Sequence, residues 1–259
     1  MAEWRSGKSL LVRTLTASVL IPVTLLFLWL DRILILVFVL AIINLCLIEF
    51  LRFCHRKDIY PYPACLFIVA NIVPIVVYFS SIPIYLLALS FIYIALLSLL
   101  RFDKKKFLEQ VSITIFAIIY LSILPTSLIM LRRVGFKLCL FPMILTWIFD
   151  TGAYLIGAPI GRTKLALVIS PKKSYEGIIG GLLVTFPATI LLNHWFKTTF
   201  SIFDIIFLTI GIAILSTIGD LFESAFKREA DLKDTSGIFP GHGGALDRID
   251  SLLFTIPFF

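Results

Sequence analysis

Long apolar runs, separated by short polar or basic turns, make up most of the chain. A helix that crosses a bilayer needs roughly 17–25 mostly apolar residues. Runs of that length lie near residues 14–30, 33–51, 64–80, 84–100, 111–130, 138–157, 177–194 and 202–219. A last apolar piece, 251–259, would be about 14 Å long as a helix, so either its helix begins near Leu246 or it ends within the bilayer. The pattern predicts an all-α, polytopic integral membrane protein with about eight to nine transmembrane helices.

Basic residues in the short loops predict the orientation of these helices. Lysine and arginine are enriched on the cytoplasmic side of a membrane, and the N-terminal arm and the loops at 52–57 and 101–106 are basic. The N-terminus is therefore expected to be cytoplasmic, together with the polar segment near the C-terminus. Arg132, Arg133 and Lys137 break the alternation, because they fall on the outer side of the fifth predicted helix.

Composition supports the membrane interpretation. The chain is 59% hydrophobic and 15% charged, with a mean hydropathy of +1.02. Soluble domains are about 45–50% apolar and about 25% charged, so a soluble globular domain, a disordered chain and a disulfide-rich secreted module are excluded. The net charge of +7 fits cytoplasmic loops and anionic headgroups better than nucleic acid. The four cysteines form no CxxC pair, which favours small apolar residues over bridges or metal ligands.

Polar chemistry is concentrated after residue 146. We therefore divide the single membrane domain into an N-terminal transmembrane helical region, 1–145, and a C-terminal transmembrane region, 146–259, which carries the candidate catalytic motifs.

Two carboxylates lie within or beside apolar runs, where an unpartnered charge is costly. Glu49 is three residues from Arg52, and an interfacial ion pair between them is the favoured interpretation. Asp150 has two interpretations. It is either a helix cap or interfacial group, or a functional ligand for a cation or a proton.

The segment 161–181 combines basic residues with a predicted helix start. Ser170-Pro171 is expected to break regular structure, Lys172 and Lys173 follow, and Ser174 can cap the next helix. Three glycines at the start of that helix allow close packing; they are Gly177, Gly180 and Gly181. Two lysines just before a helix N-terminus favour a phosphate site. Ordinary enrichment of lysine on the cytoplasmic side is the alternative.

The segment 219–251 carries the densest mixture of charges. On a helix, four polar residues would share one face; they are Asp220, Glu223, Ser224 and Lys227. The sequence Pro240-Gly-His-Gly-Gly244 then forbids a helix and predicts a glycine-rich turn that a ligand can approach closely. Acidic groups flanking this turn could hold Mg²⁺ by oxygen atoms, and nearby basic side chains could neutralise phosphates.

Four stretches resemble the signature of the phosphatidate cytidylyltransferase family, also called CDP-diacylglycerol synthases. They are Asp150-Thr-Gly-Ala-Tyr154, then Ser170-Pro-Lys-Lys-Ser-Tyr-Glu-Gly177, then Ser224-Ala-Phe-Lys-Arg228 with Lys233-Asp234, and finally Pro240-Gly-His-Gly-Gly244 with Asp247-Arg-Ile-Asp250. The resemblance covers roughly residues 146–251. The chain departs from the usual pattern at Ala245, where a larger aliphatic residue is usual, and at Ser174-Tyr175, where Thr-Trp is usual.

The resemblance implies a nucleotidyltransferase of phospholipid biosynthesis that converts CTP and phosphatidate into CDP-diacylglycerol and pyrophosphate. It also implies Mg²⁺, with room for a second cation, a homodimer, and an active site facing the cytoplasm from the cell (inner) membrane. The implied catalytic residues are Asp220, Asp247, Lys227, Arg228, Lys233, Asp234, His242 and Arg248. The implied substrate-binding residues are Lys172, Lys173, Ser224, Gly243, Gly244 and Asp250. The implied metal ligands are Asp220 and Asp247, with Asp150 and Glu223 as weaker candidates.

Three other functions are open to a protein of this kind. A CDP-alcohol phosphotransferase is disfavoured because its D-G-x-x-A-R…G…D…D spacing is absent. A related CTP-dependent nucleotidyltransferase acting on another lipid phosphate is compatible with the motifs. An ion-coupled transporter could use Asp150 and Asp220 as ion sites, although transporters often have paired halves, and here the polar residues gather in one part of the chain.

Overall fold

A computed structural model describes residues 2–30, 32–80, 83–232, 234–241 and 243–259. The chain forms two compact units. Unit 1 comprises Met1–Val134 and Leu232–Arg248, and unit 2 comprises Gly135–Asp231 and Ile249–Phe259.

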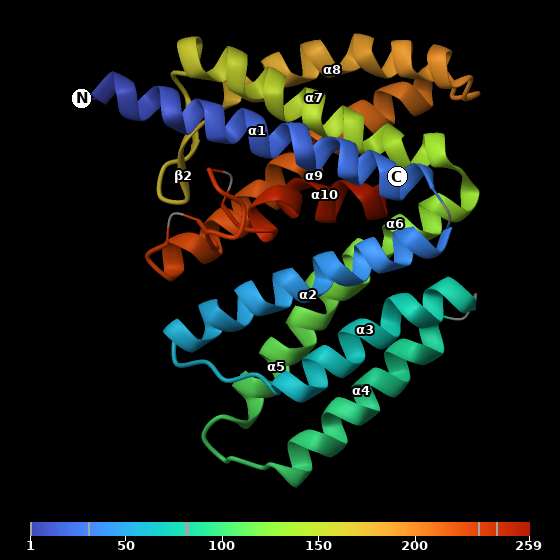
Figure 1. Cartoon of the computed structure of the whole chain (residues 1–259), viewed down its shortest axis with the longest axis vertical. Helices are drawn as coiled ribbons and strands as arrows, with labels where there is room; N and C mark the ends of the chain where they lie inside the picture. Colours follow the sequence, from blue (N-terminus) through green and yellow to red (C-terminus); the bar gives the residue numbers. More distant parts are fainter. Residues whose placement is uncertain (1, 31, 81–82, 233, 242) are drawn as a thin grey trace. The chain divides into compact units, whose positions relative to one another are not determined.

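Unit 1 is built from apolar helices. They are α1 (Ala2–Trp29), α2 (Arg32–Arg56), α3 (Pro63–Phe79), α4 (Pro83–Leu100), α5 (Phe107–Ile118), the π-helical turn η1 (Ile119–Ile123) and α6 (Leu124–Val134). The helices α2, α3 and α6 pack against one another (Figure 1). Between α2 and α3, Asn44 and Asn71 exchange amide hydrogen bonds of 2.7 and 3.1 Å. This pair satisfies two polar groups within otherwise apolar helices.

The π-helical turn η1 joins α5 to α6 and precedes a proline. Pro125 has no N–H and its ring conflicts with a regular α-helical turn before it, and a wider turn relieves that conflict. The Ser122 hydroxyl within η1 donates a hydrogen bond of 2.8 Å to the carbonyl of Ala70 on α3. The predicted single run 111–130 is therefore one continuous helical path with a local irregularity.

Two arginines at the end of α6 explain the exception to the predicted charge alternation. Arg132 donates hydrogen bonds to the carbonyls of Leu28 and Leu30, at 2.6 and 3.0 Å, near the C-terminus of α1. Arg133 donates to the carbonyls of Val77 and Tyr78 near the C-terminus of α3. The last carbonyls of a helix have no partner within that helix and attract positive charge. These two residues therefore have a structural role that a charge-counting rule does not include.

Unit 2 contains three long helices and a small hairpin. Its elements are α7 (Phe136–Ile160), β1 (Lys164–Ala166), β2 (Ser170–Ser174), α8 (Tyr175–Phe196), α9 (Ile202–Glu229) and most of α10 (Leu246–Phe258). The contact between α7 and α8 is extensive (Figure 1). The predicted role of the glycines is confirmed, because a Cβ atom added to Gly177 would lie 3.2 Å from the Cα of Gly157, and one added to Gly181 would lie 2.7 Å from the Phe149 ring.

The antiparallel hairpin β1–β2 departs from the all-helical prediction. Lys164 pairs with Ser174 and Ala166 pairs with Ser170, so the prediction that Ser170-Pro171 breaks regular structure is wrong. A two-stranded hairpin has only edge strands, where a proline without an N–H is tolerated. Ser174 ends β2 and caps α8 as predicted, since its hydroxyl accepts a hydrogen bond of 3.2 Å from the N–H of Gly177.

Five described helices are long and apolar enough to cross a membrane. They are Ile33–Arg56, Phe107–Val134, Phe136–Ile160, Tyr175–Phe196 and Ile202–Glu229. Shorter apolar helices occupy Ser18–Trp29, Pro63–Phe79 and Ala88–Leu100. The protein is accordingly a helical integral membrane protein, while the expected eight to nine spans and the cytoplasmic N-terminus stay predictions. The last apolar piece belongs to a helix that begins at Leu246, one of the two alternatives for it.

Candidate active site

Three carboxylates from three helices of unit 2 lie near one another. Asp150 is on α7, Asp220 is on α9 and Asp250 is on α10. An added Cβ at Gly219 would lie 2.5 Å from the carbonyl oxygen of Asp250, so the backbones of α9 and α10 approach closely beside Asp220. The Ser216 hydroxyl donates a hydrogen bond to Asp150. Burial raises the pKa of Asp250 to about 7, and the neighbouring Asp220 carboxylate raises it as well.

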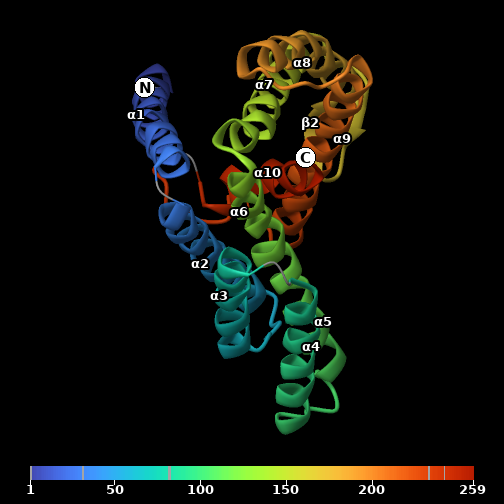
Figure 2. The same ribbon diagram turned by 90° about the vertical axis from the view of Figure 1, so that its right-hand side faces the viewer.

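A lysine from the hairpin joins this cluster. The ammonium of Lys173 lies 2.8 Å from a carboxylate oxygen of Asp220, whose side chain is 37% exposed. Lys173 also donates to the carbonyl of Thr217, at 3.4 Å. In Figure 2, β2 lies beside α9, as these contacts require. Lys172, the preceding residue, is exposed, and both lysines stand just before the N-terminus of α8.

The predicted polar face of α9 is confirmed. The Ser224 hydroxyl donates a 3.1 Å hydrogen bond to Asp220, and Lys227 forms an ion pair with the fully buried Glu223. Arg228, one residue later, instead donates a 3.2 Å hydrogen bond to the carbonyl of Ile169 in the hairpin turn. The end of α9 is therefore tied to the hairpin that carries Lys173.

The glycine-rich turn belongs to unit 1 and is organised by Asp247. The Oδ2 atom of Asp247 accepts hydrogen bonds from the N–H of Thr235 at 2.8 Å, from the Thr235 hydroxyl at 2.7 Å and from the N–H of Gly244 at 2.8 Å. Gly243 has a φ of +83°, which strongly favours glycine. An added Cβ at Gly244 would lie only 2.1 Å from the Thr235 hydroxyl oxygen.

Glu49 on α2 also binds this turn, and the sequence-based interpretation of it is wrong. The residue is 2% exposed, and its carboxylate accepts hydrogen bonds from four groups of the segment 235–246. The ion pairs among the described residues do not include one between Glu49 and Arg52. The donors, including the Thr235 and Ser236 hydroxyls, were also missed. Their only signal in the sequence is a polar Thr-Ser pair directly before the glycine-rich turn.

The predicted site residues are thus distributed over both units. The members in unit 2 are Asp150, Lys172, Lys173, Asp220, Glu223, Ser224, Lys227, Arg228 and Asp250, whereas those in unit 1 are Asp234, Gly243, Gly244, Asp247 and Arg248. Asp234 and Arg248 are exposed. The predictions for Lys233 and His242 lie outside the described residues.

Metal binding would depend on oxygen donors, and unit 2 supplies them. Among the described residues, no three His, Cys, Asp or Glu side chains form a group that could hold a metal ion by themselves. Mg²⁺ needs no such enclosure, because it keeps several waters and uses one or two carboxylates together with phosphate oxygens. The donor set around Asp220 fits such an ion, and its partial exposure leaves it accessible.

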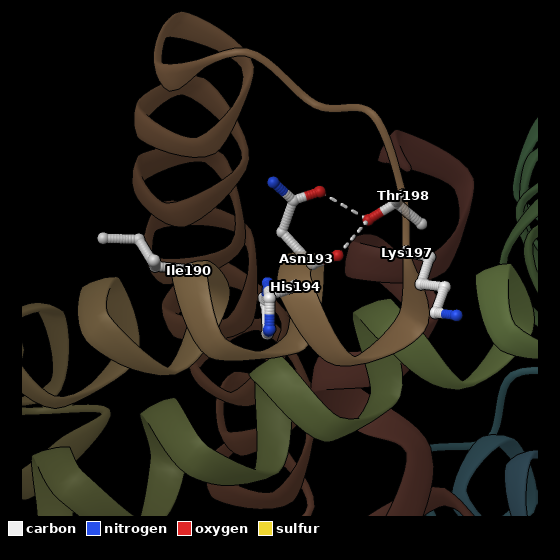
Figure 3. A pocket seen from close by; sticks show the side chains of 5 residues that line it. All are labelled: Ile190, Asn193, His194, Lys197 and Thr198. Atoms are coloured by element: carbon white, nitrogen blue, oxygen red, sulfur yellow. Dashed lines mark hydrogen bonds between the residues drawn. The ribbon is translucent and has the colours of Figure 1, made fainter.

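A surface hollow of about 410 Å³ lies elsewhere in unit 2, where α8 ends (Figure 3). It is lined by Ile190, Asn193, His194, Lys197 and Thr198. The Thr198 hydroxyl donates to the amide oxygen of Asn193 at 2.6 Å, which fixes the turn after the helix. None of the predicted site residues lines this hollow, so it adds nothing to the candidate site.

Comparison with known proteins identifies similar sequences. Residues 11–259 match the sequence profile of the cytidylyltransferase family. A phosphatidate cytidylyltransferase of Haemophilus influenzae is 45% identical over 129 residues, which are 48% of this chain and 45% of that protein. Phosphatidate cytidylyltransferases of Staphylococcus saprophyticus and Staphylococcus haemolyticus are 36% and 37% identical over 173 residues, 66% of this chain and 65% of each protein. The chain therefore covers less than two thirds of the length of these relatives.

Proposed function

This chain belongs to the cytidylyltransferase family, and from that premise we propose that it transfers the cytidylyl group of CTP to phosphatidate. The products would be CDP-diacylglycerol and pyrophosphate. One observation carries the proposal: Asp150, Asp220 and Asp250 gather near Lys173, directly before the N-terminus of α8. Carboxylates, an ammonium group and a helix N-terminus together suit a metal-assisted phosphate reaction.

In the proposed reaction, an oxygen of the lipid phosphate forms a bond to the α-phosphorus of CTP. The bond from that phosphorus to the oxygen bridging to the β-phosphate breaks, and its electron pair leaves with pyrophosphate. The attacking oxygen is already anionic, so no side-chain nucleophile is needed. The protein therefore has to position two negatively charged groups and offset their repulsion.

We assign separate tasks to the residues of each unit. In unit 2, Lys172 and Lys173 would bind phosphate oxygens, and the pairing of Lys173 with Asp220 shows that its ammonium is held in place. In unit 1, the turn containing Gly243 and Gly244 would present backbone to the substrate. Asp234 and Arg248 remain further candidates, as do Lys227 and Arg228.

Asp220 and Asp247 are the proposed metal ligands, and Asp150 and Glu223 are weaker candidates. Mg²⁺ held there would neutralise phosphate charge during the transfer. A second cation and a homodimer stay predictions. We further propose that the protein resides in the inner membrane with its site facing the cytoplasm, which the basic residues of the loops support.

The test is a reconstitution of the purified protein in lipid nanodiscs with CTP, phosphatidate and Mg²⁺. Equal amounts of CDP-diacylglycerol and pyrophosphate are expected, and chelation of Mg²⁺ by EDTA should abolish both. No product under these conditions would refute the proposal. Product formed only from another lipid phosphate would instead support the related nucleotidyltransferase, and ion flux without product would support the transporter.

A further inference from the structure

Glu49 lies on a predominantly apolar helix, far in sequence from the motifs of the candidate site. It is a buried acidic residue within a candidate membrane span, Ile33–Arg56. A carboxylate in such a place is costly unless it is well partnered, and it marks a functional position by default. Its partners therefore indicate what the residue does.

Each oxygen of the Glu49 carboxylate lies within hydrogen-bond distance of two donors. Oε1 accepts from the Ser236 hydroxyl and from the N–H of Ala245, the latter at 2.8 Å. Oε2 accepts from the N–H of Leu246 at 2.9 Å and shares the Thr235 hydroxyl proton, whose oxygen lies 3.1 Å away, with Asp247. Four donors on two oxygens need an acceptor-only group. A carboxylate provides this, whereas an amide would turn an N–H toward two of the donors.

Two of these donors are backbone N–H groups at the start of α10, those of Ala245 just before the helix and of Leu246, its first residue. The helix begins at Leu246, and the N–H groups at a helix start have no acceptor within the helix. Ala245, at the preceding position, has no side-chain oxygen with which to cap it. Glu49 supplies that acceptor from a distant part of the chain, and its negative charge suits the positive end of the helix.

The other two donors tie Glu49 to the glycine-rich turn. The Thr235 hydroxyl lies between the Glu49 and Asp247 carboxylates and within hydrogen-bond distance of both. Gly244 packs so closely that an added Cβ would lie 2.4 Å from Oε1 of Glu49. Contact with Glu49 therefore sets the position of the turn, and of Asp247, which binds the same Thr235 hydroxyl from the first turn of α10.

We propose that Glu49 is a positioning residue for the reaction: its carboxylate anchors the segment 235–246 and so holds Asp247 and the Gly243–Gly244 backbone in a productive geometry. This inference rests on the proposed function, because that function assigns the turn to the substrate. Displacement of a positioned group by about 1 Å can reduce a rate by about 100-fold.

The kinetic test compares Glu49→Gln with Glu109→Gln, a matched control on the exposed face of α5. We expect Glu49→Gln to lower kcat/KM for CTP by about 10- to 100-fold, as removal of a group that orients a metal ligand does. Its KM for CTP should change as well. Glu109→Gln should stay within about twofold of the unmodified protein. If Glu49→Gln only lowered the amount of folded, active enzyme and left KM for CTP unchanged, the positioning role would be overturned.

A second measurement does not depend on activity. All four native cysteines are buried, and a Cβ at Gly237 would meet nothing within 4 Å, so Gly237→Cys offers a site for a nitroxide spin label on the segment. We expect Glu49→Gln to add a mobile component to the electron paramagnetic resonance spectrum, and Glu109→Gln to leave it unchanged. Identical spectra for the two variants would refute the anchor.

One milder variant, Ser236→Ala, covers the case in which Glu49→Gln fails to fold. Ser236→Ala removes one of the four donors and leaves the carboxylate itself satisfied. It should give a smaller loss in kcat/KM, about threefold to tenfold, and an intermediate label mobility. If the unmodified protein made no CDP-diacylglycerol, the proposed function would fail. The spin-label comparison would then still decide whether Glu49 anchors the segment.

Discussion

In unit 1, the carboxylates of Glu49 and Asp247 accept hydrogen bonds from backbone and hydroxyl groups of one short segment. In unit 2, Asp150, Asp220 and Asp250 instead lie near one another and beside Lys173. Glu49 is 2% exposed as a residue, whereas the Asp220 side chain is 37% exposed. A carboxylate such as that of Glu49, both of whose oxygens are used by the fold, acts on structure. An accessible carboxylate beside like charges is suited to bind a cation.

This difference separates two kinds of acidic residue that look alike in the sequence. Removal of charge in unit 2 should affect the chemical step and leave the fold intact, because few donors depend on those oxygens. In unit 1, a substitution that removes a hydrogen-bond acceptor, or that adds a side chain within the turn, should lower activity by displacing the segment 235–246. The following substitutions test this distinction, beginning with the largest expected effect.

Asp220→Asn should lower turnover by about 100- to 1,000-fold while the protein remains folded. It removes a proposed metal ligand and the partner of Lys173, and the loss of one such electrostatic group typically costs about 100- to 1,000-fold in kcat. Asp231→Asn is the matched control, because Asp231 is exposed in the same unit and asparagine tolerates its φ of +52°. Steady-state rates and melting curves of both variants provide the measurement. Near-normal turnover of Asp220→Asn would remove Asp220 from the metal site.

Asp247→Asn distinguishes ligand from anchor within unit 1. The asparagine oxygen can still accept the hydrogen bonds from Thr235 and Gly244, so a spin label at position 237 should keep its mobility. Turnover should nevertheless be lost, because the charge of Asp247 is proposed to bind a metal ion. Retained turnover with an unchanged spectrum would show that Asp247 serves only to hold the turn.

Gly244→Ala should reduce kcat/KM by about 100-fold, the scale expected for a displaced site. Its methyl group would collide with the Thr235 hydroxyl and the Glu49 carboxylate. Gly237→Ala makes the same chemical change in open space and should have little effect on the rate. Equal rates for the two variants would contradict the close packing of the turn on Glu49.

The features predicted best from the sequence depend on residues close together along the chain. The Ser174 cap, the glycine contacts between α7 and α8 and the polar face of α9 follow from helix-start chemistry and helical spacing. The apolar runs predicted most helices for the same reason. The hairpin was missed because its strands are too short and too polar to show alternation.

The features that were not predictable depend on distant partners. Glu49 lies 186 residues before Thr235 in the chain, and the nearby Arg52 offered a reasonable local partner. For the same reason the sequence shows Arg132 and Arg133 only as an exception to the charge alternation, since the carbonyls that they bind lie more than 50 residues earlier. Residue type showed that a charge required a partner, but only the fold could show which partner it has.

Lys173→Gln should lower kcat/KM for CTP by about 10- to 100-fold, because hydrogen bonds to charged groups contribute about 1.5–3 kcal/mol. Lys172→Gln provides the comparison. Lys172 is exposed, and its loss should cost only a few fold and depend more strongly on salt. Rates measured at two ionic strengths test both expectations. A larger loss of kcat/KM in Lys172→Gln than in Lys173→Gln would show that the ion pair with Asp220 does not identify the lysine that contributes more to the reaction.

Arg133→Gln should have the smallest effect on catalysis and a clear effect on stability. The arginine satisfies carbonyls at the end of α3, so its loss should cost about 1–3 kcal/mol of folding free energy, while KM for CTP stays within about twofold. Arg101→Gln removes the same charge from an exposed position of unit 1 and should leave the melting temperature unchanged. A changed KM in Arg133→Gln would mean that the end of α3 also influences the geometry of the glycine-rich turn. The distinction between structural and chemical charges would then have to be drawn residue by residue within unit 1.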